Sequence, residues 1–278
     1  MTIDHERERH TVQSTATTTP SAAHELFNKV PLVTLVFWII KILATTIGET
    51  AADVLSTTLK LGLVVTSFVM GALLLISLIV QIRTKRYVPT VYWIAVLFIS
   101  VVGTLISDNL VDNLGVSLAT TTIIFASALV AVFVIWYRVE RTLSVHTIDT
   151  PRRELFYWAA ILFTFSLGTS GGDLLSERLG LGYAVALGVF AAGIAIVYAL
   201  YRFRLIDGVL AFWAAYILTR PLGASAGDLL TADADEGGLA INRVVVSAII
   251  LVVVIGLVAL LTARERKHPQ PSISSPVA

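Results

Sequence analysis

The sequence predicts an all-α integral membrane protein of eight transmembrane helices, and two observations lead to that prediction. The first is composition: 56% of the 278 residues are hydrophobic and only 14% are charged, against about 25% charged in an ordinary soluble domain. The second is a motif that occurs four times along the chain. The composition excludes a water-soluble protein. The net charge of +1 provides no general field that would attract nucleic acid.

Eight apolar stretches are each long enough for a helix across a hydrocarbon core, which takes about 20 residues. They cover approximately residues 31–55, 61–82, 89–110, 116–137, 154–175, 182–201, 207–230 and 241–262. The first stretch is no signal peptide, because a long polar segment containing acidic residues precedes it. All eight should be helical, since lipid offers no hydrogen-bond partner to an open backbone.

The distribution of basic residues predicts the orientation, because cytoplasmic loops are enriched in Lys and Arg. Fifteen of the 20 basic residues lie in the two tails and in the connections after the second, fourth and sixth stretches. Both termini are therefore predicted to be cytoplasmic, with disordered tails at 1–28 and 268–278. The membrane halves between them, 29–145 and 146–267, hold two repeats each. The opposite side is acidic and would attract cations.

The repeated motif is Trp-x9-Gly-x4-Asp-x-Leu, and every copy lies on an odd-numbered stretch. Its tryptophans are Trp38, Trp93, Trp158 and Trp213, its glycines Gly48, Gly103, Gly168 and Gly223, and its aspartates Asp53, Asp108, Asp173 and Asp228. Copies one and three, like copies two and four, stand 120 residues apart, which indicates two duplications of a helical hairpin. The four hairpins should be parallel repeats with a pseudo-fourfold or two-by-two arrangement about the membrane normal.

A polar stripe precedes each aspartate on the same helical face, at positions three, four, seven and eight residues before it. Its members are Thr45, Thr46, Glu49, Thr50, Ser100, Thr104, Ser166, Thr169, Ser170, Arg220 and Ser225, and Asp112 and Glu177 continue it four residues beyond their aspartates. The even stretches are almost wholly aliphatic or aromatic. Because a polar stripe is costly in lipid, the odd helices should form an inner ring and the even helices an outer ring.

Two segments predict irregular backbone just before an aspartate. The third copy contains Gly168-Thr169-Ser170-Gly171-Gly172, and the fourth contains Arg220-Pro221-Leu222-Gly223. Helices five and seven should therefore kink or unwind there. Their freed carbonyl groups would then be available as ligands beside the carboxylates.

Several motif residues have a structural as well as a functional interpretation. The tryptophans are typical interfacial anchors, and the glycines fit close helix packing, with a hinge as the alternative. Lys41 is expected to snorkel to the cytoplasmic surface, while Arg220 could either snorkel or serve as an internal counter-charge to the aspartates. The acidic segment 233–238 lacks the spacing of a calcium loop and is expected to be a solvated turn.

The sequence argues against an enzyme. No histidine lies in an apolar stretch to activate a nucleophile, and there is no Gly-x-Ser-x-Gly elbow, Walker A motif or dinucleotide fingerprint. The Gly-Asp pairs at 172–173 and 227–228 lack the tyrosine that twin-aspartate intramembrane proteases place beside the first aspartate. No organic cofactor is implied.

One resemblance rests on two segments. Lys29-Val30-Pro31 with the run from Phe37 to Thr50, and Arg220-Pro221-Leu222-Gly223-Ala224 with Gly227-Asp228, resemble a bacterial family of polytopic proteins described as "uncharacterised membrane-anchored protein". The resemblance covers about residues 28–262. It implies a bacterial inner (plasma) membrane location and supplies no substrate.

The leading functional hypothesis is a cation transporter or channel. Asp53, Asp108, Asp173 and Asp228 would form an outer coordination ring, with Glu49, Asp112 and Glu177 as auxiliary carboxylates. Oxygen ligands suit a hard divalent ion of the Mn²⁺ or Mg²⁺ type, or protons, and this ion would be the substrate. The alternative is a structural or sensory membrane protein in which the repeated Gly and Asp only cap and pack helices. The expected partners are the lipid bilayer and a small cation or proton. Homo-oligomerisation is left open.

Overall fold

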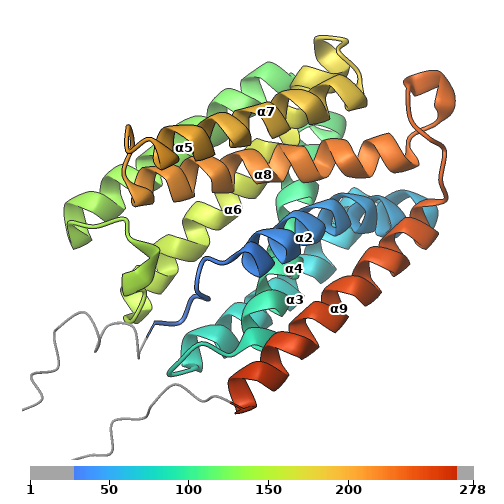
Figure 1. The fold of residues 1–278 in the computed structure, drawn as a ribbon. Coiled ribbons are helices and arrows are strands. Elements are labelled where there is room, and N and C mark those ends of the chain that lie inside the picture. Colours follow the sequence, from blue (N-terminus) through green and yellow to red (C-terminus); the bar gives the residue numbers. More distant parts are fainter. Residues whose placement is uncertain (1–27, 268–278) are drawn as a thin grey trace, which may run out of the picture.

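The computed structural model describes residues 28–267, and within this range it is all-helical, with no strand (Figure 1). Eight long helices follow one another: α2 (Leu35–Asp53), α3 (Leu63–Arg83), α4 (Pro89–Asp108), α5 (Leu118–Glu140), α6 (Pro151–Asp173), α7 (Tyr183–Arg202), α8 (Gly208–Thr231) and α9 (Arg243–Lys267). The tails predicted at 1–28 and 268–278 lie, except for Asn28, outside the described residues.

Seven of the described helices are long and apolar enough to cross a membrane, and α6 is not among them. The first turn of α6 holds Arg152, Arg153 and Glu154, and its last turns are rich in Ser, Thr and Gly. The all-helical fold and the membrane assignment predicted from the sequence are therefore confirmed in this coarser form.

Four helices form a closed inner ring in which α2 packs on α4, α4 on α6, α6 on α8, and α8 again on α2. At least half of the apolar window is buried in each of α2, α4 and α8, against less than a quarter in each of α3, α5, α7 and α9. The odd-numbered spans are thus the inner helices, as the polar stripes predict, and the others surround them (Figure 1).

Each outer helix packs mainly on the inner helix of the following repeat. Helix α3 lies along α4, α5 along α6 and α7 along α8, and α9 closes the circle on α2. Within each of the first three repeats, contact between the two helices is concentrated at the short turn that joins them. The two helices of a repeat follow each other in the chain, but the outer helix packs on the inner helix of the next repeat.

The motif glycines lie where two inner helices approach most closely. A Cβ atom added to Gly48 would collide with Ser100, one added to Gly103 with Phe165, one added to Gly168 with Arg220, and one added to Gly223 with Thr45. These partners all stand eight residues before the aspartate of the next repeat, and the fourth glycine packs against the first repeat. The pattern confirms close packing and shows that the four repeats are arranged cyclically.

The prediction that helices five and seven unwind before their aspartates is wrong. Helix α6 is continuous through residues 168–172, and α8 is continuous with Pro221 inside it. The irregular backbone comes after the aspartate instead, as a π-helical turn in the first three repeats: η1 (Val54–Thr58), η2 (Asn109–Asn113) and η4 (Leu174–Arg178). In the fourth repeat α8 continues to Thr231, and the turn η5 (Ala234–Glu236) follows.

The four tryptophans do not act as a ring of lipid-facing anchors. Trp93, Trp158 and Trp213 are buried in an aromatic cluster inside the bundle, and Trp38 is half-buried beside Phe37 and Phe212. The interfacial interpretation is wrong for the three buried side chains. Because the motif aspartates lie at the opposite ends of the same helices, the bundle has an aromatic end and a carboxylate end.

Candidate functional site: a carboxylate-lined cavity above a buried arginine

The four motif aspartates line a single cavity of about 290 Å³ at the carboxylate end of the inner ring. Each comes from a different inner helix, at the point where the regular helix ends in the first three repeats. The next turn contributes Thr57, Asp112 and Glu177, which stand four residues further along. The shared helical face predicted from the sequence thus brings all seven candidate carboxylates, Glu49 included, to one cavity.

The cavity wall is strongly acidic. Its carboxylic side chains are Glu49, Asp53, Asp108, Asp112, Asp173, Glu177, Asp228 and Glu236, and Arg243 is its only basic side chain among the described residues. The Arg243 Nε atom lies 3.7 Å from an Asp53 carboxylate oxygen. Carboxylates so close together repel one another unless cations or protons enter among them.

The carboxylates surround the cavity without forming a finished chelate. Within residues 28–267, no group of three or more His, Asp or Glu side chains is arranged to hold one metal ion. Of the predicted auxiliary groups, Glu49 is already paired with Arg220, while Glu177 lies 3.5 Å from the Tyr183 hydroxyl group. The sequence analysis missed Glu236, Tyr183 and Arg243, because they come from connections and outer helices that carry no repeated motif.

Arg220 lies inside the inner ring, eight residues and about two helical turns before Asp228 on α8. Its side chain is fully buried, and its Nη2 atom donates to Glu49 Oε2 at 2.8 Å and to Thr169 Oγ1 at 2.7 Å, and also to Thr104 Oγ1. Its Nη1 atom donates to the Thr45 carbonyl oxygen at 3.3 Å. Arg220 therefore does not snorkel but serves as an internal counter-charge, and its ion-pair partner is Glu49 rather than a motif aspartate.

The side-chain partners of Arg220 occupy equivalent positions in their repeats. Glu49, Thr104 and Thr169 each stand four residues before their aspartates, and the fourth repeat has the small Ala224 at that place. A single guanidinium thus contacts the corresponding residue of all three other repeats. The four-residue spacing could have predicted this layer, because residues at i and i+4 share a helical face.

Lys41 is also buried in the ring and does not snorkel, so that prediction is wrong. Its side chain has 0% exposure, and its Nζ atom donates to Thr219 Oγ1 at 3.1 Å. The ammonium group lies 4.2 Å from the ring centre of Tyr216 and 4.6 Å from that of Phe165, distances at which an aromatic face attracts a cation. Phe165 is shared, because the Arg220 guanidinium carbon lies 5.6 Å from the same ring centre.

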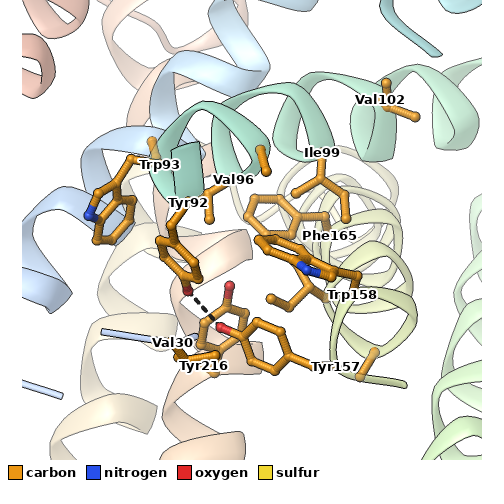
Figure 2. Close-up of a cluster of buried hydrophobic side chains, with 14 of the residues drawn as sticks. Val30, Tyr92, Trp93, Val96, Ile99, Val102, Tyr157, Trp158, Phe165 and Tyr216 are labelled. Carbon is orange, nitrogen blue, oxygen red and sulfur yellow. Dashed lines mark hydrogen bonds between the residues drawn. The ribbon is translucent and has the colours of Figure 1, made fainter. Parts of the chain in front are cut away.

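Aromatic side chains fill the ring beyond Lys41. The Tyr92 and Tyr157 hydroxyl groups are 2.6 Å apart, and Figure 2 shows Tyr216 beside them together with Trp158 and Phe165. All five side chains are buried. At this end Lys29 forms a buried ion pair of 2.8 Å with Glu154, which also accepts from Gln81 at 3.0 Å.

A second cavity, of about 870 Å³, lies at the aromatic end between α2, α7 and α8. Most of its lining is aliphatic or aromatic, and Trp38 and Ile42 belong to it. Thr219, the hydrogen-bond partner of Lys41, also lines this cavity, whereas Glu49, the partner of Arg220, lines the acidic one. The buried polar layer around Arg220 and Lys41 thus has one hydrogen-bond partner in the wall of each cavity.

The acidic segment after α8 is the exposed turn that the sequence predicts. Asp233 and Asp235 are exposed around the 3₁₀ turn η5, and Gly237 continues it with a φ of 88°. Neither aspartate belongs to the cavity wall, although the neighbouring Glu236 does.

Comparison with known proteins finds one family. A family model described as "Repeat of Unknown Function (DUF347)" matches residues 36–87, 91–142, 156–205 and 211–267. Each match contains one copy of the tryptophan, glycine and aspartate motif. No curated protein and no solved structure matches the chain.

Proposed function

The chain belongs to the DUF347 repeat family, and since that family's description assigns no activity, we propose from the site that the protein transports a hard divalent cation of the Mg²⁺ or Mn²⁺ type, with proton coupling. The observation that carries this proposal is the cavity in which one aspartate from each of four repeats faces the same space. Helix caps that served only their own loops would have no reason to share a cavity.

The cavity chemistry suits a hydrated ion better than a dry chelate. Mg²⁺ usually keeps several water molecules and binds through one or two protein carboxylates. A water molecule takes about 30 Å³ in the liquid, so a cavity of about 290 Å³ has room for a cation with its first hydration shell. The absence of cysteine makes a soft ion a poor fit.

The membrane arrangement forms part of the proposal. All eight helices cross a bacterial inner membrane, α6 included, because α6 packs in the ring between α4 and α8. Its polar residues face the interior, which explains its low apolar content. The excess of basic residues at the aromatic end supports a cytoplasmic position for both termini. The acidic cavity then opens toward the outside, and the buried layer closes the path inward.

A flux measurement tests the proposal. In proteoliposomes the double variant Asp108→Asn with Asp228→Asn should lose nearly all Mg²⁺ or Mn²⁺ flux, because two of the four ring carboxylates no longer attract the ion. The matched control is Asp233→Asn with Asp235→Asn, which removes two carboxylates at the same end of the bundle but outside the cavity. Equal flux in the ring variant and the control would contradict the proposal.

A structural or sensory role is the second candidate, and one observation favours it. No three carboxylates within residues 28–267 are placed to bind one ion, and the motif glycines clearly serve packing. Under this alternative the original protein should show no cation flux. The double variant Asp108→Asn with Asp228→Asn should then differ from it only by a loss of stability. Flux in the original protein therefore separates the two candidates.

A further inference from the structure

The Arg220 guanidinium occupies the place on the ring axis that a cation leaving the cavity would have to enter. Glu49 forms the floor of the acidic cavity, and its Oε2 atom lies 2.8 Å from Arg220 Nη2. Beneath this contact the described side chains are closely packed, with Phe165, Lys41 and the three tyrosines fully buried. A cation cannot pass this layer while the guanidinium remains in it.

The contacts of Arg220 are those that a bound cation would make. Its Nη2 atom meets one carboxylate and two hydroxyl oxygens, from Glu49, Thr104 and Thr169, and Nη1 meets the Thr45 carbonyl oxygen. Carboxylate, hydroxyl and carbonyl oxygens are also the ligands that hard cations prefer. Four oxygen atoms from three repeats thus surround one positive charge supplied by the fourth repeat.

The arrangement is asymmetric, because the fourth repeat differs from the other three. Repeats one to three contribute Glu49, Thr104 and Thr169, while repeat four contributes Ala224 at the same position. The Arg220 side chain rises from the layer below, where the other repeats have Thr45, Ser100 and Phe165. The Nε atom of Arg220 is buried without a hydrogen-bond partner among the described residues, so only the two terminal nitrogen atoms of the side chain form hydrogen bonds.

We propose that the Arg220 guanidinium is a tethered cation that competes with the transported ion for the Glu49 layer, so that an ion enters by displacing it. This inference rests on the proposed transport function and adds the residue that gates it. In the empty protein Arg220 neutralises Glu49 and closes the path. An arriving ion takes over Glu49, Thr104 and Thr169, and the released guanidinium stays within the protein beside Phe165.

Mg²⁺ binding to the purified full chain, followed by isothermal titration calorimetry in detergent, tests the competition. Arg220→Gln leaves Glu49 without its counter-charge, so the Kd for Mg²⁺ should fall by about tenfold or more. Glu49→Gln should raise the Kd by a similar factor. The double variant should return to within about threefold of the original protein, because the competing pair is removed as a unit.

Arg178→Gln is the matched control, because it removes one positive charge at the same end of the bundle, from an exposed side chain outside the cavity wall. Its loss should change the Kd by less than about threefold. An Arg220→Gln protein with the same Kd as the original would overturn the inference. So would an effect no larger than that of Arg178→Gln.

Arg220→Lys keeps the test decisive if the glutamine variant fails to fold. A lysine keeps the charge but lacks the guanidinium fork, so it should compete less well and lower the Kd several-fold. An unchanged Kd in a folded Arg220→Lys protein would overturn the inference. Failure of the transport proposal itself would look different: the original protein would then bind no Mg²⁺, or would bind it equally well after the Asp108 and Asp228 replacements.

Discussion

The sequence pattern places individual residues on one face of a helix, but it does not identify the partner of each side chain. The four-residue spacing puts Glu49, Thr104 and Thr169 on the faces of their aspartates, and the structure adds that a single arginine joins them. Lys41 shows the limit of such reasoning. A lysine three residues beyond a presumed interfacial tryptophan is expected to reach water. It stays inside because it lies one turn beyond the buried Phe37, on the inner face of α2.

Replacing Lys41 tests what burial costs this residue. Its ammonium group contacts Thr219 and two aromatic rings and forms no ion pair with a carboxylate among the described residues. Burying a charge without an ion partner is costly. Lys41→Met should therefore keep or raise the unfolding temperature in detergent. Lys85→Met, at an exposed position, is the control with little expected change. A clear drop in unfolding temperature for Lys41→Met would show that the lysine stabilises the fold.

At the scale of the helices, most of the arrangement could be predicted. Hydropathy located the eight helices, and the polar stripes separated inner from outer helices. The sequence reasoning failed at α6 and α8, where glycine and proline suggested unwinding. Gly168 instead allows close approach to Arg220 and Pro221, and neighbouring helices hold α8 straight enough to stay helical through Pro221. Tertiary packing outweighs local helix preference there.

The motif glycines allow a quantitative test of how closely the inner helices pack. Gly103→Ala would place a Cβ atom 2.6 Å from the Phe165 Cβ atom and 3.2 Å from the Ser166 backbone nitrogen. Overpacking of this kind should destabilise the bundle by about 1–3 kcal/mol. Gly71→Ala in α3 has no atom within 4 Å of the new methyl group and should be neutral or stabilising by about 0.5–1 kcal/mol. Thermal unfolding in detergent measures both changes. Equal stabilities of the two variants would contradict the role of Gly103 in close packing of the inner helices.

At the scale of the molecule, the cyclic order of the repeats decides where the site lies. Four similar helices around one axis bring four similar residues together at every level, so one end becomes acidic and the other aromatic. The repeated motif predicted this convergence of the aspartates. It could not predict the two cavities. Nor could it predict that each outer helix covers the inner helix of the next repeat, because nothing in a single repeat specifies which neighbour its second helix will cover.

Removing α9 tests this packing of outer helices on neighbouring repeats. Truncation after Asn242 deletes α9, the helix that packs along α2, and should uncover the first repeat while leaving α4, α6 and α8 with their own outer partners. Limited proteolysis should then cut first within or beside α2. Cleavage that began in α6 or α8 would contradict the order of packing.

The same packing of outer helices on neighbouring repeats has a consequence for how the protein is made. A ribosome produces α2 first and α9 last, so the first inner helix waits through the whole of synthesis for its cover, while every other inner helix emerges just after the helix that will cover it. Since the two ends of the described chain lie at the same end of the bundle (Figure 1), a circularly permuted gene that begins at α3 and joins α9 to α2 through a short linker would deliver the closing pair together. Such a chain would complete its ring in a different order and arrive at the same fold.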